Sequence, residues 1–296
     1  MDRTFVFALL VSLGACTRPE LSRGEASEDS APEVFEPTQV VTAPGQVRWV
    51  QFRAPPGWGD AELQCRDLVI KHSALQAETE RFAYVAESYF SDLSPHACKL
   101  VKAGEAREVA AFKVESFRFK EEQLKVDSRK VSLSPKDADR AAREQKLLNE
   151  LYKQSAPTPY FSAPFQVPLK SAITSVYGIR RVYNKQHKGQ HLGTDFRAAV
   201  GVPVPASNRG RVMFAGDLFF TGGTVIIDHG MDIFSVYGHL SEVKVQAGQI
   251  VSSGDLVGLS GNTGRSSGPH LHWGIKIHGH YVDGFSLIEE TKKQFP

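Results

Sequence analysis

The chain has 296 residues, of which 41% are hydrophobic and 23% are charged, with three cysteines and ten histidines. This composition predicts a folded chain with a sizeable core, and it excludes the disordered, collagen-like and disulfide-dense classes. The formal net charge is +2 and no long run of Lys and Arg occurs, so we expect no nucleic acid as a partner. Three is an odd number of cysteines, so one of them needs a role of its own.

The first 15 residues have the pattern of a secretory signal peptide. Arg3 precedes an apolar run from Phe5 to Leu13, which is too short for a membrane-spanning helix. The segment then ends in Leu-Gly-Ala before Cys16, which resembles the lipobox of bacterial lipoproteins. The resemblance implies cleavage before Cys16 and acylation of this residue, so that a lipid anchor ties the protein to a membrane. The alternative is an ordinary signal peptide followed by an unmodified cysteine.

Residues 16–40 are expected to form an acidic, disordered tether. From residue 17 onward they hold six acids, two arginines and three prolines, with almost no apolar periodicity. Residues 1–40 contain three of the chain's 35 bases and seven of its 33 acids, so residues 41–296 carry a net charge of +6. A positive body on an acidic tether suits an anionic partner surface.

Residues 41–118 have the pattern of a small antiparallel β domain, similar to a sandwich. Short alternating runs such as VRWVQF and EVAAFKVESFRF are separated by turns rich in Pro, Gly and Ser. Outside the cytoplasm, Cys65 and Cys98 are expected to pair, and two reduced, buried thiols are the alternative. His72 and His96 stand alone, so we expect them at the surface. The role of this domain stays open between spacing, docking and covering a neighbouring site.

A linker over residues 119–159 contains one convincing helix, at 134–154. Ser134 and Pro135 supply an N-cap and a first-turn proline, and Asp137 occupies the third helical position. The apolar face consists of Ala141, Leu147, Leu148, Leu151 and Tyr152. We expect this helix to pack on a neighbouring domain.

Two histidine motifs in the strand-rich residues 160–292 have the spacing of a metal site. In HLGTD, the interior Gly and Thr disfavour a helix, so His191 and Asp195 are expected on one face of an extended segment. His270 and His272 would likewise share one face of a strand. A catalytic zinc takes three protein ligands of these types and keeps one position open. Each motif alone is a weak indication of metal binding.

The other histidines of this region fit a metal site to different degrees. His278 and His280 have the same spacing but flank a glycine, so we interpret them as a hairpin tip. His187 lies in a polar loop and His229 in a turn, and both are set aside. His239 ends an apolar strand and remains a candidate for the site.

The order of these motifs closely resembles the lysostaphin/LytM-type zinc metalloendopeptidases, over roughly residues 160–290. The run ITSVYGIRR, then HLGTD, then YGHL, then a glycine-rich approach to HLH occur in that family's order. The resemblance implies one Zn²⁺ per chain, with three ligands: His191, Asp195 and His272. It also implies that His239 and His270 are the catalytic pair. One departure is Gly274 after Trp273, where family members often have Glu.

The resemblance also implies a fold and a substrate. We expect a mostly β chain: a small β-sandwich-like domain, a linker helix, and a C-terminal antiparallel β metallopeptidase domain of the lysostaphin/LytM-like, duplicated hybrid motif type. The expected activity is hydrolysis of peptide bonds in the peptide stems of bacterial peptidoglycan. Metal-activated water would attack the bond, with one histidine of the pair as general base.

The cellular location of the protein is predicted by analogy with other lipoproteins. Thr17 after the acylated cysteine resembles sorting to the outer membrane of a Gram-negative cell, facing the periplasm, which favours D-Ala–meso-diaminopimelate cross-links. A non-hydrolytic wall-binding regulator of other cell-wall hydrolases is the main alternative. Such relatives usually lack several metal ligands, and none is missing here. A zinc peptidase that acts on proteins is a third possibility, and we expect a monomer in each case.

Overall fold

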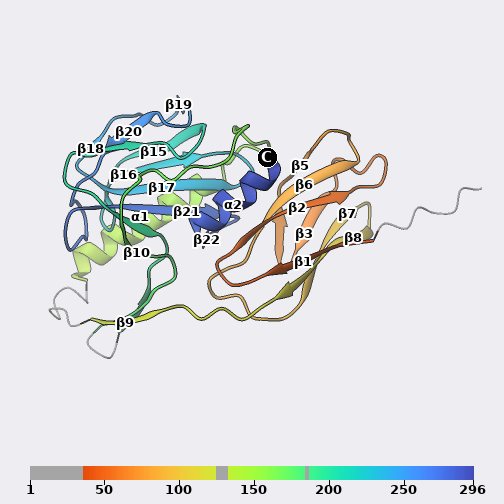
Figure 1. Ribbon diagram of the computed structural model, residues 1–296, viewed down its shortest axis with the longest axis horizontal. Coiled ribbons are helices and arrows are strands. Elements are labelled where there is room, and N and C mark those ends of the chain that lie inside the picture. Colours follow the sequence, from red (N-terminus) through yellow and green to blue (C-terminus); the bar gives the residue numbers. More distant parts are fainter. Residues whose placement is uncertain (1–35, 125–132, 184–186) are drawn as a thin grey trace, which may run out of the picture. The chain divides into compact units, whose positions relative to one another are not determined.

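The computed structural model describes residues 36–124, 133–183 and 187–296 (Figure 1). These residues contain 22 strands and two helices, which confirms the predicted mostly β fold class. The predicted signal peptide, Cys16 and the tether up to residue 35 lie outside the described residues. Within the described ranges, no helix has the length and apolar character needed to cross a membrane.

The N-terminal part of the described chain forms two sheets that face each other. One sheet has the order β1-β8-β7-β3-β4 and the other the order β2-β6-β5. The strand bounds are β1 Thr38–Thr42, β2 Val47–Arg53, β3 Glu62–Cys65, β4 Leu68–Ile70, β5 His72–Ala74, β6 Glu80–Ala86, β7 His96–Lys102 and β8 Glu105–Val114. Buried side chains such as Phe52, Leu63 and Phe112 form the apolar core between the sheets.

Two features of this sandwich differ from the expected pattern. Strand β1 begins at Thr38, inside residues 16–40, because its β-branched residues pair with the far strand β8. That pairing is parallel, so the domain is not wholly antiparallel.

The predicted disulfide is confirmed: Cys65 and Cys98 are partners across β3 and β7, with Cα atoms 4.2 Å apart.

The expectation that His72 and His96 lie at the surface is wrong. The His96 side chain is 9% exposed and its ring stacks on Phe112, with centroids 4.8 Å apart. Both ring nitrogens of His72 are hydrogen bonded: Nε2 lies 2.7 Å from the carbonyl oxygen of Ala61, and Nδ1 accepts from Arg81 Nε at 2.6 Å. The partners that cover these rings come from other strands, which local sequence does not reveal.

The linker contains strand β9, Glu121–Leu124, and helix α1, Pro135–Tyr152. Ser134 is the N-cap of α1, and its hydroxyl accepts from the backbone N–H of Asp137 at 3.2 Å. Leu151 packs on apolar side chains of the C-terminal domain, whereas Leu147, expected on the same face, is 52% exposed. The helix therefore packs against the C-terminal domain, as predicted.

An antiparallel sheet of eight strands forms the centre of the C-terminal domain, with the order β10-β13-β21-β17-β16-β15-β19 and β22 beside β21. Two small sheets, β12-β11-β9 and β14-β20-β18, flank it. The bounds are β10 Ile173–Ser175, β11 Arg180–Tyr183, β12 His187–Gln190, β13 Thr194–Arg197, β14 Pro203–Pro205, β15 Gly210–Leu218, β16 Gly222–Asp228, β17 Ile233–Leu240, β18 Glu242–Val243, β19 Ile250–Val251, β20 Leu256–Leu259, β21 His270–Ile277 and β22 His280–Val282. Helix α2, Gly284–Gln294, follows β22.

The sandwich and the catalytic domain share apolar and polar contacts through α2. Tyr84 of the sandwich belongs to the same buried apolar cluster as the catalytic sheet. Ser286 Oγ accepts from the backbone N–H of Val47 at 3.0 Å and donates to its carbonyl at 3.1 Å. Glu290 accepts from the backbone N–H of Trp49 at 3.0 Å. The two predicted domains therefore share buried contacts.

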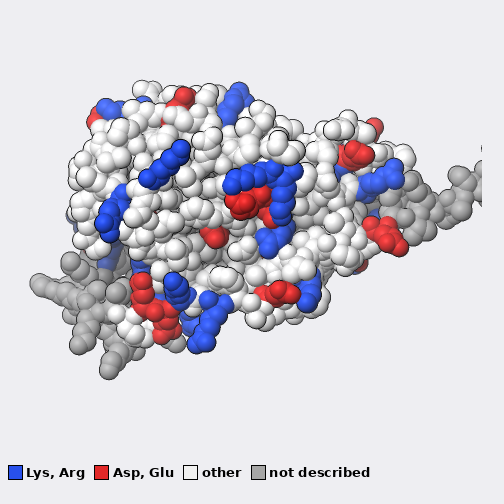
Figure 2. All heavy atoms as spheres, in the orientation of Figure 1, with Lys and Arg blue, Asp and Glu red and all other residues white. Residues whose placement is uncertain are grey.

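Charged side chains on the face drawn in Figure 2 lie scattered, some alone and some in small groups of mixed sign. Among the ion pairs of the molecule, Glu290 of α2 lies 3.7 Å from Arg48 and 2.6 Å from Lys293. On this face, the surplus of positive charge is thus not gathered into one patch.

Candidate metal centre

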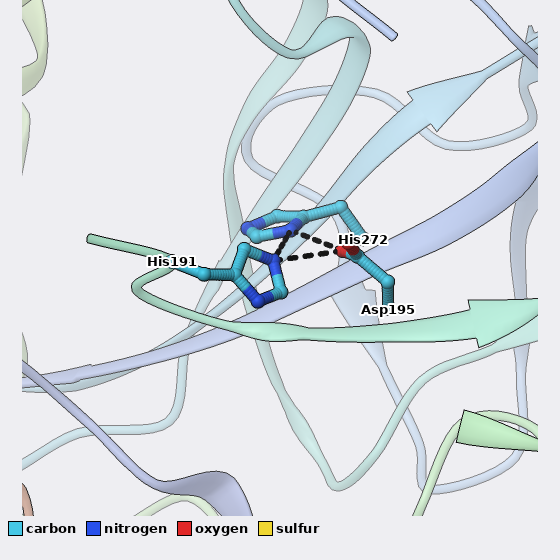
Figure 3. A group of neighbouring side chains, drawn as sticks. All are labelled: His191, Asp195 and His272. Carbon is cyan, nitrogen blue, oxygen red and sulfur yellow. Dashed lines mark hydrogen bonds and ion pairs between the residues drawn. The ribbon is translucent and has the colours of Figure 1, made fainter. Parts of the chain in front are cut away.

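Three side chains from two neighbouring strands and a loop meet above the catalytic sheet (Figure 3). Asp195 on β13 and His272 on β21 are direct partners in the strand pairing, so the register places both on one face. His191 Nε2 lies 3.0 Å from Asp195 Oδ1, and His272 Nδ1 lies 2.9 Å from the same oxygen. The two ring nitrogens are 3.3 Å apart. Three potential ligand atoms therefore converge on one point.

The loop that carries His191 differs from the predicted extended strand. Strand β13 begins only at Thr194, so His191 lies in the preceding loop and reaches the cluster from the side. Gly193 makes this approach possible, since a Cβ there would lie 2.4 Å from His272 Cε1. The interior glycine therefore leaves the space that the His272 ring occupies.

The proton positions of His191 follow from its partners. Its Nδ1 lies 3.0 Å from the carbonyl oxygen of Val176, and a carbonyl only accepts, so Nδ1 carries the proton. Ser175 Oγ lies 3.0 Å from the same nitrogen and accepts from Arg181 at 2.8 Å. Nε2 therefore presents its lone pair to the cluster, as a metal ligand must.

Arg181 also faces the second oxygen of Asp195, with its guanidinium 3.9 Å from Oδ2. Because Oδ2 faces this cation, Oδ1 is the oxygen that faces both histidines. Burial alone would raise the pKa of Asp195, but the adjacent rings of His191 and His272 hold it well below its usual range. Burial lowers the pKa of His272, which favours its neutral form. A carboxylate and two neutral imidazoles are a donor set that fits Zn²⁺.

His239 and His270 lie beside this cluster as a second pair. His270 Nε2 is 3.7 Å from Asp195 Oδ1, and the rings of His239 and His270 have centroids 4.6 Å apart. His270 Nδ1 donates to the carbonyl of Gly268 at 2.7 Å, and His239 Nδ1 donates to that of Thr263 at 2.8 Å. Each Nε2 therefore has a free lone pair when the ring is neutral. Burial lowers the pKa of His239 to about 4.

His229 and His278 have partners outside the cluster. His229 is fully buried and bonded to the carbonyl of Arg209 and the hydroxyl of Ser235, each at 2.8 Å. His278 forms the tip between β21 and β22, as predicted, but it is buried, with Nε2 2.8 Å from the carbonyl of Tyr84. Among the described residues, His191, Asp195 and His272 are the one group of three placed to hold a metal ion.

Several supporting groups were not singled out from the sequence. Thr263 is an example. Its carbonyl accepts the hydrogen bond from His239 Nδ1. Its hydroxyl accepts from Gly223 N–H at 2.9 Å and donates to the carbonyl of Leu240 at 2.7 Å. Only the glycine-rich character of its loop indicated a nearby site. Gly274, the one departure from the family pattern, faces the Tyr281 ring and the carbonyl of Leu192, away from the ligand atoms.

Comparison with known proteins identifies the domain that carries this cluster. Residues 189–284 match the profile of the family described as Peptidase family M23. This part of the chain is therefore similar to the M23 peptidases. The matched range contains the three converging residues as well as His239 and His270.

Two curated proteins similar to the M23 domain are peptidoglycan peptidases by name. The peptidoglycan DD-endopeptidase ShyA of Vibrio cholerae is 39% identical over 120 residues, which cover 40% of this chain and 28% of ShyA. The DD-carboxypeptidase/endopeptidase Mpg of Neisseria meningitidis is 39% identical over 101 residues, which cover 34% of this chain and 23% of Mpg. The chain thus spans only about a quarter of the length of these relatives.

The similarity to one solved structure extends beyond the M23 domain. A crystal structure of a candidate M23 peptidase from Pseudomonas aeruginosa is 26% identical and has a TM-score of 0.66. The match covers 84% of this chain and 95% of that chain. The sandwich and the catalytic domain therefore occur together in a second protein.

Proposed function

We propose that this protein is a zinc-dependent endopeptidase that hydrolyses peptide cross-links of peptidoglycan, with D-Ala–meso-diaminopimelate bridges as its substrate. The observation that carries the proposal is the convergence of His191, Asp195 and His272 beside the pair His239 and His270 within an M23 domain. The names of ShyA and Mpg support a peptidoglycan substrate.

The metal would be held by His191 Nε2, Asp195 Oδ1 and His272 Nδ1. When bound, Zn²⁺ supplies a Lewis acid that polarises a carbonyl and makes water acidic. The chain's own contribution is to hold these three atoms in place before the metal arrives, through the β13–β21 register and the bonds to His191 Nδ1.

We assign the general base to His270. Its Nε2 lies 3.7 Å from Asp195 Oδ1, and the bond from Nδ1 to Gly268 leaves Nε2 free to accept the proton of the attacking water. The same nitrogen then returns that proton to the leaving amine. His239 stands beside it and would stabilise the negative oxygen of the tetrahedral intermediate as an imidazolium, because Nδ1 is bonded to Thr263 and Nε2 has to carry a second proton. The developing negative charge would therefore have to raise the pKa of His239 from about 4.

Digestion of purified sacculi tests this function. The zinc-loaded protein should convert cross-linked muropeptide dimers to monomers in the absence of any other hydrolase. His270→Ala should keep the fold and the metal but lose about 10²-fold or more of the rate. A folded, zinc-loaded protein that leaves the dimers intact would contradict the proposal and favour a regulator, whereas cleavage of casein in place of sacculi would favour a protein substrate.

We also propose that Cys16 is acylated and that the lipid holds the protein in the outer membrane, facing the periplasm. The lipobox-like sequence before Cys16 and the following Thr17 support this location. Wild-type protein should separate with outer-membrane vesicles on a density gradient, and Cys16→Ser should not. Equal distribution of the two proteins would contradict the anchor, and separation with inner-membrane vesicles would contradict the location.

A further inference from the structure

Five aromatic rings form a continuous cluster that runs from the sandwich through the linker to the catalytic domain. Tyr89 and Phe119 stack with centroids 4.3 Å apart, and Tyr177 lies against both, at 6.4 and 6.2 Å. Phe90 touches Tyr89 at 4.9 Å, and Phe117 touches Phe119 at 4.9 Å. The cluster therefore has an inner end at Tyr177 and an outer end at two phenylalanines.

The outer end of the cluster is open to solvent. Phe90 is 69% exposed and Phe117 is 52% exposed, whereas Tyr177 is buried. A single exposed apolar residue needs no explanation, but two exposed rings on one packed cluster form a surface that indicates binding. Because their neighbours Tyr89 and Phe119 hold them, these rings would lose little conformational freedom on contact with a ligand.

The inner end of the cluster adjoins the candidate metal centre. The residue before Tyr177 supplies the Val176 carbonyl that receives His191 Nδ1, and the residue after it, Gly178, donates its N–H to the carbonyl of His191 at 2.7 Å. Gly178 has a φ of +83°, and a Cβ there would lie 2.2 Å from the Phe119 ring. The segment that positions the first ligand is thus the one on which the aromatic cluster rests.

Basic side chains accompany the exposed rings. Arg118 and Lys120 alternate in sequence with Phe117 and Phe119. Arg180 lies on the neighbouring strand, and its backbone N–H donates to the carbonyl of Lys120 at 2.8 Å. All three side chains are exposed, and the described residues offer none of them an ion pair. Glu121 and Glu122 follow Lys120 on β9, so this segment carries charges of both signs. Two exposed rings and three cations that have no ion pair among the described residues suit a ligand with both apolar faces and carboxylates.

We propose that this aromatic and basic surface binds the glycan strand of peptidoglycan while the attached stem peptide enters the catalytic site. The proposal rests on the proposed function and gives the sandwich a role in substrate recognition. A pyranose ring presents a face of C–H groups, which the negative face of an aromatic ring attracts. The carboxylates of the stem peptides would face Arg118, Lys120 and Arg180.

The test compares two substrates with the double variant Phe90→Ala/Phe117→Ala. Hydrolysis and binding of intact sacculi should fall about tenfold, which corresponds to about 1.4 kcal/mol, because both exposed ring faces are lost. Hydrolysis of a sugar-free, cross-linked peptide dimer should stay within about twofold of wild type, because that probe lacks the glycan. The variant Leu147→Ala, at an exposed apolar position on α1, is the matched control and should leave both rates unchanged.

The outcomes separate this inference from the proposed function. If wild-type protein cleaves neither substrate, the proposed function itself fails. If wild-type cleaves both and the double variant cleaves sacculi at the wild-type rate, or loses both activities equally with its fold intact, the glycan surface is wrong. The variant Phe90→Tyr/Phe117→Tyr keeps the rings and should restore cleavage of sacculi, which a loss of stability in the alanine variant would not explain.

Discussion

Asp195 and His272 are direct partners in the pairing of β13 with β21, and His272 Nδ1 lies 2.9 Å from Asp195 Oδ1. Two of the three proposed ligands are therefore fixed by the register of one strand pair in the middle of an eight-stranded sheet. A slip of one residue would turn both side chains to the other face, and the buried neighbours Phe196 and Leu271 oppose that slip. These two ligands thus lie on paired strands, which position side chains more precisely than loops do.

The space at Gly193 gives a sharp test of this geometry. Gly193→Ala would place a methyl group 2.4 Å from His272 Cε1 and 2.8 Å from the carbonyl oxygen of Trp273, so the ring has to move. We expect loss of zinc binding, measured by titration, with the fold retained in circular dichroism. Gly268→Ala is the matched control, because no atom lies within 4 Å of its added Cβ, and it should bind zinc normally. Equal zinc affinity in both variants would contradict the proposed ligand geometry.

Histidine substitutions should separate the metal centre from the domain interface. His191→Ala removes a ligand and should abolish zinc binding and activity together. His278→Ala should keep one zinc per chain, because His278 lies at the hairpin tip and bonds to the carbonyl of Tyr84. Loss of that buried hydrogen bond should instead lower stability by about 1–3 kcal/mol, seen in urea denaturation. Loss of zinc from His278→Ala would place the metal elsewhere.

Arg181 is expected to act as a positioning residue for the metal. It donates to Ser175, the partner of His191, and its guanidinium lies 3.9 Å from Asp195 Oδ2. Arg181→Met should weaken zinc affinity about 10–100-fold, measured by competition with a chelator. The adjacent Arg180→Met is the control, because Arg180 is exposed and contacts neither residue, so its zinc affinity should match wild type. Equal affinities in both variants would show that Arg181 does not orient the ligands.

Acid should destabilise the folded protein through His229. Burial lowers the pKa of His229 to about 4, against an unfolded value of 6.5, so the unfolded chain binds more protons between these values. Its contribution to the free energy of unfolding should fall by about 2 kcal/mol between pH 8 and pH 5. His229→Gln removes this titration and should flatten the pH dependence by that amount, whatever its absolute stability. An unchanged slope would contradict a neutral, buried His229.

The candidate site could be predicted to a large extent because its residues lie in short motifs. The H-x-H spacing on a strand and the glycine in HLGTD are local features, and the structure brings His191, Asp195 and His272 together. Ser175 and Arg181 could not be found in this way, because their contacts with the site depend on how β10 and β11 lie beside β13.

Burial at the domain interface was not predictable for the same reason. His278 lies at a hairpin tip, where exposure is expected, yet its Nε2 bonds to the carbonyl of Tyr84 in the sandwich. His96 is covered in the same way within the sandwich, by Phe112 of the neighbouring strand. The separation into an N-terminal and a catalytic domain likewise followed from sequence pattern, whereas Tyr84 of the sandwich packs in the catalytic core. Such contacts join residues far apart in the chain, so no local periodicity of the sequence predicts them.

The most direct test of the central claim is digestion of a purified, cross-linked muropeptide dimer in water enriched in ¹⁸O. The zinc-loaded protein should release monomers in which the new D-Ala carboxyl group carries one ¹⁸O atom, as read by mass spectrometry. The signal should vanish with His191→Ala and with the metal-free wild-type protein. Intact dimers after incubation with the folded, zinc-loaded protein would contradict a zinc-dependent peptidoglycan endopeptidase.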